Sequence, residues 1–279
     1  MEAETVEKAA ASGKAKMQML EVDAPRYWLR SILAGMYLSI VVLVYWSISE
    51  NLHATPFAPF GKLIASAFFG VGLSIIVFTN AELFTSNNMY LAVAAAAHRV
   101  SWTQTARLWA SCWLGNLIGA VLLSLLLLGA GVLGDLPPSH ALFAGALHKA
   151  HQSASVIFFK GILANWVVCL AVWVALRVKE DLTRIVAMIL IVFIFLYLGF
   201  EHSIANMGTF AMSLLGSGTL TLGDAGFNLL FSTAGNIVGG GLFVGCAYHY
   251  LSPGSSDSQE AAVSGNKASL TAQLKQSGS

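Results

Sequence analysis

Long apolar segments fill most of the chain, and two of them are interrupted by short polar stretches. A helix that crosses a bilayer needs about 20 apolar residues. Six segments reach or approach that length, at about 28–48, 63–97, 105–133, 155–176, 185–215 and 226–251. The chain is 56% hydrophobic and only 10% charged, whereas about a quarter of the residues in a soluble domain are charged. The sequence therefore predicts an all-α integral membrane protein and excludes a soluble domain.

The polar stretches fall inside the second and fifth segments. The first, TNAELFTSNN, runs from Thr79 to Asn88, and the second, EHSIANM, runs from Glu201 to Met207. At membrane depth, irregular backbone is tolerated only where protein buries it or where it lines a watery path. We interpret both stretches as helix breaks. A half-helix that begins at a break presents unpaired N–H groups and a positive dipole end, so two facing ends would attract a small anion.

Three sequence landmarks recur in the same order, which indicates two halves of three segments each. ILAGMYLSIVVLVYW at Ile32 returns as ILANWVVCLAVW at Ile162, 130 residues later. The AEL that contains Glu82 returns as the FEH that contains Glu201, and GNLIGA returns as GNIVGG. Because three is odd, the second half enters the membrane from the opposite side. We therefore expect six transmembrane helices in an inverted 3+3 repeat, with broken second and fifth helices and a site near the midplane.

Lysine and arginine residues gather on one side of the predicted membrane. Twelve of the fifteen lie in the N-terminal segment, the C-terminal tail and the connections after the second and fourth segments. The other side holds Lys62, Lys149 and Lys160. By the positive-inside rule we expect both termini in the cytoplasm, as an even number of spans requires.

The composition divides the chain into three regions. We expect a cytoplasmic N-terminal segment at 1–27, a six-helix pore domain at 28–252 and a disordered cytoplasmic tail at 253–279, rich in serine, glycine and glutamine. Within the N-terminal segment, Val6 to Val22 is either a short amphipathic helix on the membrane surface or a poorly ordered tail. The three cysteines lie in apolar runs and are interpreted as core residues.

Five polar residues in and around the predicted breaks have two interpretations each. An ionisable residue at mid-membrane is costly, so a functional role is favoured for His202 over that of a hydrogen-bonded core histidine. Glu82 and Glu201 are interpreted as acceptors for N–H groups of the following loops, with a proton relay as the alternative. For Asn116 and Asn236, we favour interhelical hydrogen bonds that pin the breaks over pore lining.

The motifs AELFTS, GILANWVVCLAVW and EHSIAN resemble those of the formate/nitrite transporter family. The resemblance covers the chain apart from its tails, and EHSIANMGTFAMSLLG looks closest to the bacterial nitrite channel branch. It implies an aquaporin-like protomer with its own pore, assembled as a homopentamer in a bacterial inner membrane.

The resemblance also implies roles for individual residues. Leu83, Phe84 and Thr85 would form a mobile loop at the first break, with Thr85 facing the central pore histidine, His202, and Asn165 nearby. The apolar constrictions would be built by Phe69, Leu73, Val168 and Phe195. The supporting residues would be Glu201 and Asn206, which orient the histidine and its loop, and Lys149, which lies in the loop before the fourth span and draws anions in.

The leading functional hypothesis is a pore for small monovalent anions, chiefly nitrite, in which His202 contacts or protonates the anion. A formate or hydrosulfide channel of the same family is the alternative. An aquaporin-like pore for neutral solutes is disfavoured because the chain lacks paired NPA boxes. A membrane enzyme or haem protein would need clustered ligands, and the sequence has neither H-E-x-x-H nor C-x-x-C. We therefore expect no enzyme activity, cofactor, metal or nucleic-acid partner.

Overall fold

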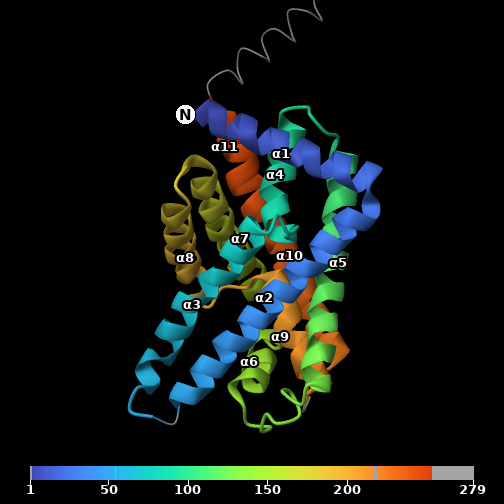
Figure 1. Ribbon diagram of the computed structural model, residues 1–279. Helices are drawn as coiled ribbons and strands as arrows, with labels where there is room; N and C mark the ends of the chain where they lie inside the picture. The colour runs from blue at the N-terminus through green and yellow to red at the C-terminus, as the bar shows by residue number, and fades with distance from the viewer. Residues whose placement is uncertain (1, 54, 217–218, 253–279) are drawn as a thin grey trace, which may run out of the picture.

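The computed structural model describes residues 2–53, 55–216 and 219–252, and within these ranges every regular element is a helix. Figure 1 shows the helices gathered into one elongated bundle. Five helical segments of the described chain are long and apolar enough to cross a membrane. They are α2 (Ala24–His53), α3 (Ala58–Phe78), α5 (Trp102–Gly129), α7 (Ala154–Arg177) and the continuous segment Leu222–Leu251.

The last of these segments contains α10 (Leu222–Ile237), the π-helix η1 (Val238–Cys246) and α11 (Ala247–Leu251). The shorter helices are α1 (Glu2–Val22), α4 (Phe84–Ala96), α6 (Ala141–Ala150), α8 (Asp181–Tyr197) and α9 (Ser203–Leu215). The second and fifth predicted segments are each divided in two, as α3 with α4 and as α8 with α9. The first division, at 79–83, falls inside the predicted break Thr79–Asn88. The second, at 198–202, begins three residues before the predicted break Glu201–Met207, most of which belongs to α9.

The two breaks have the same backbone geometry. α3 ends through Asn80 and α8 through Gly199, with φ of 53° and 70°, in the left-handed region that suits asparagine and glycine. In each case, the N–H of the very next residue bonds a carbonyl five residues back: that of Ala81 bonds Ile76, and that of Phe200 bonds Phe195. The chain then runs extended before the following half-helix starts. A left-handed residue followed by an acid two positions later is therefore the local signal that stops each helix.

The N-terminal segment is a helix that packs on the protein. Ala9, Ala10 and Met17 of α1 are buried. A Cβ on Gly13 would lie 2.5 Å from the carbonyl oxygen of Tyr90, so α1 and α4 are in backbone contact there. Of the two interpretations, the poorly ordered tail is wrong for this stretch. The predicted tail at 253–279 lies outside the described residues.

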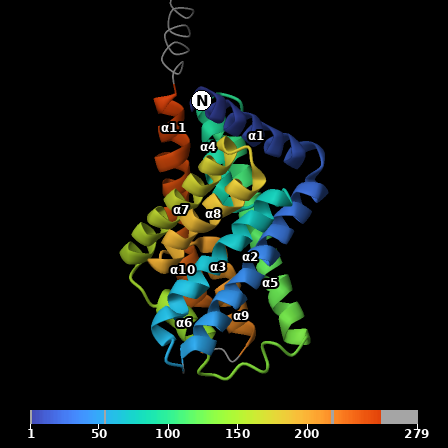
Figure 2. The ribbon, with the colours of Figure 1, turned by 60° about the vertical axis from the view of Figure 1, so that its left-hand side comes forward.

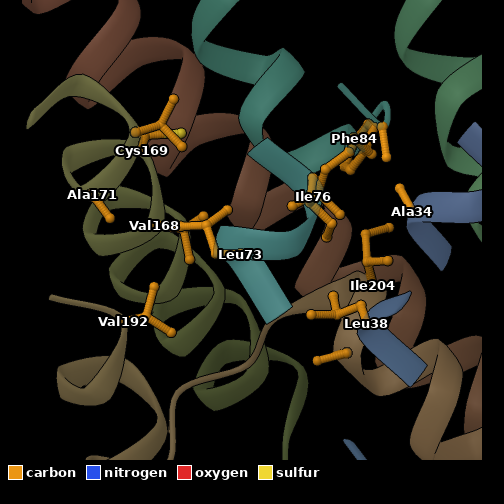
Figure 3. Packing of buried hydrophobic residues seen from close by; sticks show 14 of the residues in the cluster. Ala34, Leu38, Leu73, Ile76, Phe84, Val168, Cys169, Ala171, Val192 and Ile204 are labelled. Atoms are coloured by element: carbon orange, nitrogen blue, oxygen red, sulfur yellow. The ribbon is translucent and has the colours of Figure 1, made fainter. Parts of the chain in front are cut away.

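Both ends of the described chain lie at one end of the bundle, with α1 and α11, while α6 lies at the other end (Figures 1 and 2). Between these ends, one cluster of buried apolar residues joins both pairs of divided helices. Figure 3 shows part of it, including Leu73 of α3, Phe84 of α4, Val168 of α7, Val192 of α8 and Ile204 of α9. The breaks are therefore held inside a packed protein interior, where irregular backbone is tolerated.

Candidate functional site

His202 and Thr85 meet where the two divided helices approach each other. His202 is 3% exposed and caps α9, because its Nδ1 accepts the N–H of Ala205 at 3.2 Å. In a neutral imidazole one nitrogen accepts and the other donates, so the proton lies on Nε2. Nε2 lies 3.0 Å from Oγ1 of Thr85, and Thr85 is fully buried. The imidazole therefore donates to Thr85, and the threonine hydroxyl keeps its own proton for another acceptor.

Aromatic residues flank this pair on one side. The ring of Phe195 stacks on His202 with centroids 5.5 Å apart, and Phe69 meets Phe195 edge-on at 5.9 Å. All three residues line a small cavity of about 30 Å³. Leu73 and Val168, the other two predicted constriction residues, are buried in the core cluster of Figure 3. The structure thus brings Phe69 and Phe195 to the histidine, and the constriction roles of all four remain predictions.

Asn165 links the first turn of α4 to the last membrane helix. Its Nδ2 donates to the carbonyl of Thr85 at 3.2 Å, to Oδ1 of Asn88 at 3.0 Å and to the carbonyl of Asn236 at 2.6 Å. An amide has two N–H groups, so three acceptors share two protons. Asn165 is fully buried. Its amide therefore ties the two halves of the chain together directly behind Thr85.

Two asparagines pin the breaks, as the sequence predicts. Asn116 accepts the N–H of Phe84 at 2.9 Å and donates to the carbonyls of Ser31 and Glu82 at 2.7 and 2.9 Å. One amide thus holds both the start of a half-helix and the extended chain before it. The interpretation as interhelical hydrogen bonding is confirmed for this residue.

Asn236 does the same at the second break. It accepts the N–H of Ser203 at 2.8 Å and donates to the carbonyls of Gly161 and Glu201 at 2.8 and 3.0 Å. These contacts correct the expectation of unpaired N–H groups at the half-helix ends. Asn116, Asn236 and His202 each bind one such N–H, so the protein itself satisfies part of each positive end.

Each break also holds a buried carboxylate paired with a lysine. Glu82 is 3% exposed, and its two oxygens lie 2.8 and 2.7 Å from Nζ of Lys16 in α1. Asn87 donates to the same carboxylate at 2.9 Å. Glu201 is 1% exposed and accepts from Lys149 at 3.2 Å and from Asn206 at 2.6 Å.

These contacts correct the predicted hydrogen-bond partners of Glu82 and Glu201, and the helix bounds correct the predicted position of Lys149. The hydrogen bonds found for the Glu82 and Glu201 side chains come from lysine and amide side chains, and none of those found comes from a loop N–H group. Lys149 lies in the last turn of the short helix α6, not in a loop. Asn206 binds Glu201 and Asn228, while the ring contacts of His202 are with Thr85, Ala205 and Phe195.

A cationic cavity opens on each side of the buried centre. The cavity beneath α1 is about 720 Å³ and reaches Leu83; its cations are Lys8, Lys16, Arg30 and Arg184. The opposite cavity is about 270 Å³, and its cations include Lys62, Lys149 and Lys160. The sequence predictions missed Lys16. Its only signal is indirect, since a buried Glu82 needs a cation as Glu201 does.

Two divided helices that meet at a buried polar centre, with a cationic cavity on each side and apolar outer helices, define a membrane channel or transporter. The family model for "Formate/nitrite transporter" matches residues 3–250. The chain therefore belongs to the formate/nitrite transporter family. Its homologues are transporters and channels, not enzymes.

Three known proteins illustrate what this chain is similar to. It is 36% identical to the nitrite transporter NirC of Escherichia coli, over 90% of this chain and 92% of that protein. A solved "FNT family ion channel" matches with a TM-score of 0.85 and 33% identity, covering 90% of this chain and 99% of that one. A "Pentameric formate channel with formate bound" matches with a TM-score of 0.69 and 28% identity, covering 82% and 97%.

Proposed function

We propose that this protein conducts small monovalent anions, chiefly nitrite, through a pore in each protomer. The observation that carries the proposal is the buried Thr85–His202 pair between two cationic cavities. A relative of similar length is a nitrite transporter, which supports nitrite. Formate is the alternative cargo, because a solved structural neighbour is a formate channel with formate bound.

The geometry supports a specific order of events along the pore. Cations of either cavity draw an anion from water, and an apolar passage beside Phe69 and Phe195 removes its hydration shell. The hydroxyl proton of Thr85 then meets the anion, since its oxygen already accepts from His202. If the pair instead protonates the anion, Thr85 gives up its hydroxyl proton and takes the Nε2 proton of His202. His202 must take up a proton at Nδ1 in the same step, since an imidazolate would otherwise be left. That nitrogen is occupied by the N–H of Ala205, so the α9 cap must open during such a cycle.

Flux measurements test this proposal. Purified protein in liposomes should carry nitrite and formate faster than chloride. Hydrosulfide is measured as well, because it is the other anion that the family resemblance suggests. The measurements are repeated at several pH values, because an anion and its neutral conjugate acid respond oppositely to pH. Nitrite flux no greater than that of protein-free liposomes would contradict the proposal.

We propose a homopentamer in a bacterial inner membrane, with both termini cytoplasmic and the three regions 1–27, 28–252 and 253–279. Support for shared sidedness comes from α1 and α11 lying at one end of the bundle (Figure 2). We also propose that α8 and α9 together form a sixth span, which completes the inverted repeat. Neither helix alone is among those long and apolar enough to cross.

Native mass spectrometry should detect the pentamer as the main species. The outer surface of the protomer is strongly apolar, and large exposed apolar areas are typical of subunit or lipid contact. Examples are Leu126, Phe159, Leu190 and Leu230, which are 61%, 62%, 63% and 65% exposed. A dominant monomer or dimer would contradict the assembly and would leave the pore within one protomer untouched.

A further inference from the structure

The last membrane helix widens beside Asn165. η1 runs from Val238 to Cys246, and at its end the N–H of Ala247 bonds the carbonyl of Leu242, five residues back. Turns of this π-helical kind are rare and occur frequently at functional sites. This widened segment contains three consecutive glycines: Gly239, Gly240 and Gly241.

Gly240 makes room for the Asn165 side chain. A Cβ on Gly240 would lie 2.3 Å from Nδ2 of Asn165 and 2.8 Å from Sγ of Cys169, closer than real Cβ atoms come to their neighbours. The next glycine is different, because a Cβ on Gly241 would find its nearest atoms at 3.7 Å, an ordinary contact distance. Within one helix, therefore, only the first of these two positions requires glycine for the amide to fit.

The first half of the chain has no such room. In the sequence repeat, Gly35 occupies the position of Asn165, and Ala120 occupies the position of Gly240. A Cβ on Gly35 would lie 2.1 Å from the carbonyl oxygen of Asn116, so no side chain fits there. The larger residue of each pair is thus exchanged between the halves: the first has glycine on α2 and alanine on α5, and the second has asparagine on α7 and glycine in η1. The widened helix accompanies that exchange.

The space matters because of what Asn165 holds. Its amide donates to the carbonyl of Asn236 at 2.6 Å and to that of Thr85 at 3.2 Å. The second bond fixes the first turn of α4, which aims the Thr85 hydroxyl at His202. We propose that η1 and Gly240 position the anion site. They leave the space that the Asn165 side chain occupies, and the Asn165 amide then holds Thr85 in place. The effect on nitrite flux rests on the proposed function, whereas the seating of Asn165 stands on geometry alone.

A pair of matched alanine substitutions tests the proposal. Gly240→Ala and Gly241→Ala make the same chemical change in the same helix, so they share any effect on helix propensity. Gly240→Ala should lower nitrite flux per pentamer about tenfold, as expected for losing one buried hydrogen bond, while Gly241→Ala stays within about twofold of wild type. Equal flux in the two variants, each confirmed as a pentamer, would overturn the proposal.

A double-mutant cycle separates seating from general damage. In an Asn165→Ala background the clash with the amide is gone and only the close approach to Sγ of Cys169 remains. Gly240→Ala should therefore lower the midpoint of thermal unfolding much less than it does in the wild-type background. If Gly240→Ala lowers the midpoint equally in both backgrounds, Gly240 serves helix packing only and the positioning role is wrong.

The proposed function and this inference can fail separately. If wild-type liposomes carry no nitrite, the proposed function fails, but the unfolding cycle still decides whether Gly240 seats Asn165. A structure of the Gly240→Ala variant gives a second readout. Nδ2 of Asn165 should have left the carbonyl of Thr85, and an unmoved amide would refute the inference whatever the cargo is.

Discussion

Replacing His202 with phenylalanine is expected to abolish nitrite flux. The imidazole donates to Thr85 and accepts the N–H of Ala205. Phenylalanine does neither, so a buried hydroxyl and a buried N–H each lose a partner, at about 1–3 kcal/mol per group. The measurement is nitrite uptake by proteoliposomes from about pH 5 to about pH 8, the range in which histidine ordinarily changes charge. The variant must first be confirmed as a folded pentamer.

His202→Asn is the matched variant. Asparagine is among the best N-cap residues, so its carbonyl oxygen should keep the bond from Ala205 and preserve α9. It cannot exchange a proton, however. We expect partial nitrite flux that varies little with pH. Normal flux in the phenylalanine variant, or a wild-type pH profile in the asparagine variant, would show that His202 is not central.

Lys149→Met is expected to cause a large loss of stability. Glu201 is 1% exposed and would remain as a buried carboxylate without its cation. Removing one partner of a buried ion pair costs about 3–5 kcal/mol, and partial exposure of the lysine places this pair at the lower end. Asn206 still donates to the carboxylate but brings no positive charge. The thermal unfolding midpoint of the pentamer measures the effect, and nitrite flux should fall with it.

Lys62→Met is the control for Lys149→Met. Lys62 lines the same cavity and lies over the ring of Tyr197, with 5.7 Å from Nζ to the ring centroid. Its removal should weaken anion attraction at low salt with little change in unfolding. Adding Glu201→Gln to Lys149→Met should recover part of the stability, because no buried charge remains. If both single lysine variants unfold at the same temperature, the ion pair does not stabilise the break.

The breaks could be predicted because their signals are local. A polar stretch such as TNAELFTSNN cannot continue a lipid-facing helix, so these ten residues by themselves predict irregular backbone. The repeat then pairs Asn116 with Asn236, and their similar contacts follow. His202 stands out because an ionisable residue at mid-membrane is costly, whereas its pairing with Thr85 comes from the family motifs alone. Nothing in the residues themselves says that positions so far apart in the chain share a hydrogen bond.

The features that were missed depend on partners distant in the chain. Lys16 lies 66 residues from Glu82 in a segment of mixed charge, and nothing nearby distinguishes it from Lys8 or Lys14. The role of Gly240 could not be predicted for a different reason, because the sequence contains many similar glycines. Glycines are common in membrane helices, so one that seats a side chain looks like its neighbours. Only the positions of Asn165 and Cys169 reveal which glycine is required.

The hydrogen bonds of Asn116 and Asn236 have a consequence for the order in which the protein folds. Asn116 binds only residues of the first half, and Asn236 binds only residues of the second. Folding generally proceeds from the N-terminus during synthesis. The first break can therefore be completed before the second half leaves the ribosome. The bonds from Thr85 to His202 and Asn165 join the halves, so they form last. A partly synthesised chain can therefore complete the hydrogen bonds of the first helix break before the ion-conducting site has formed.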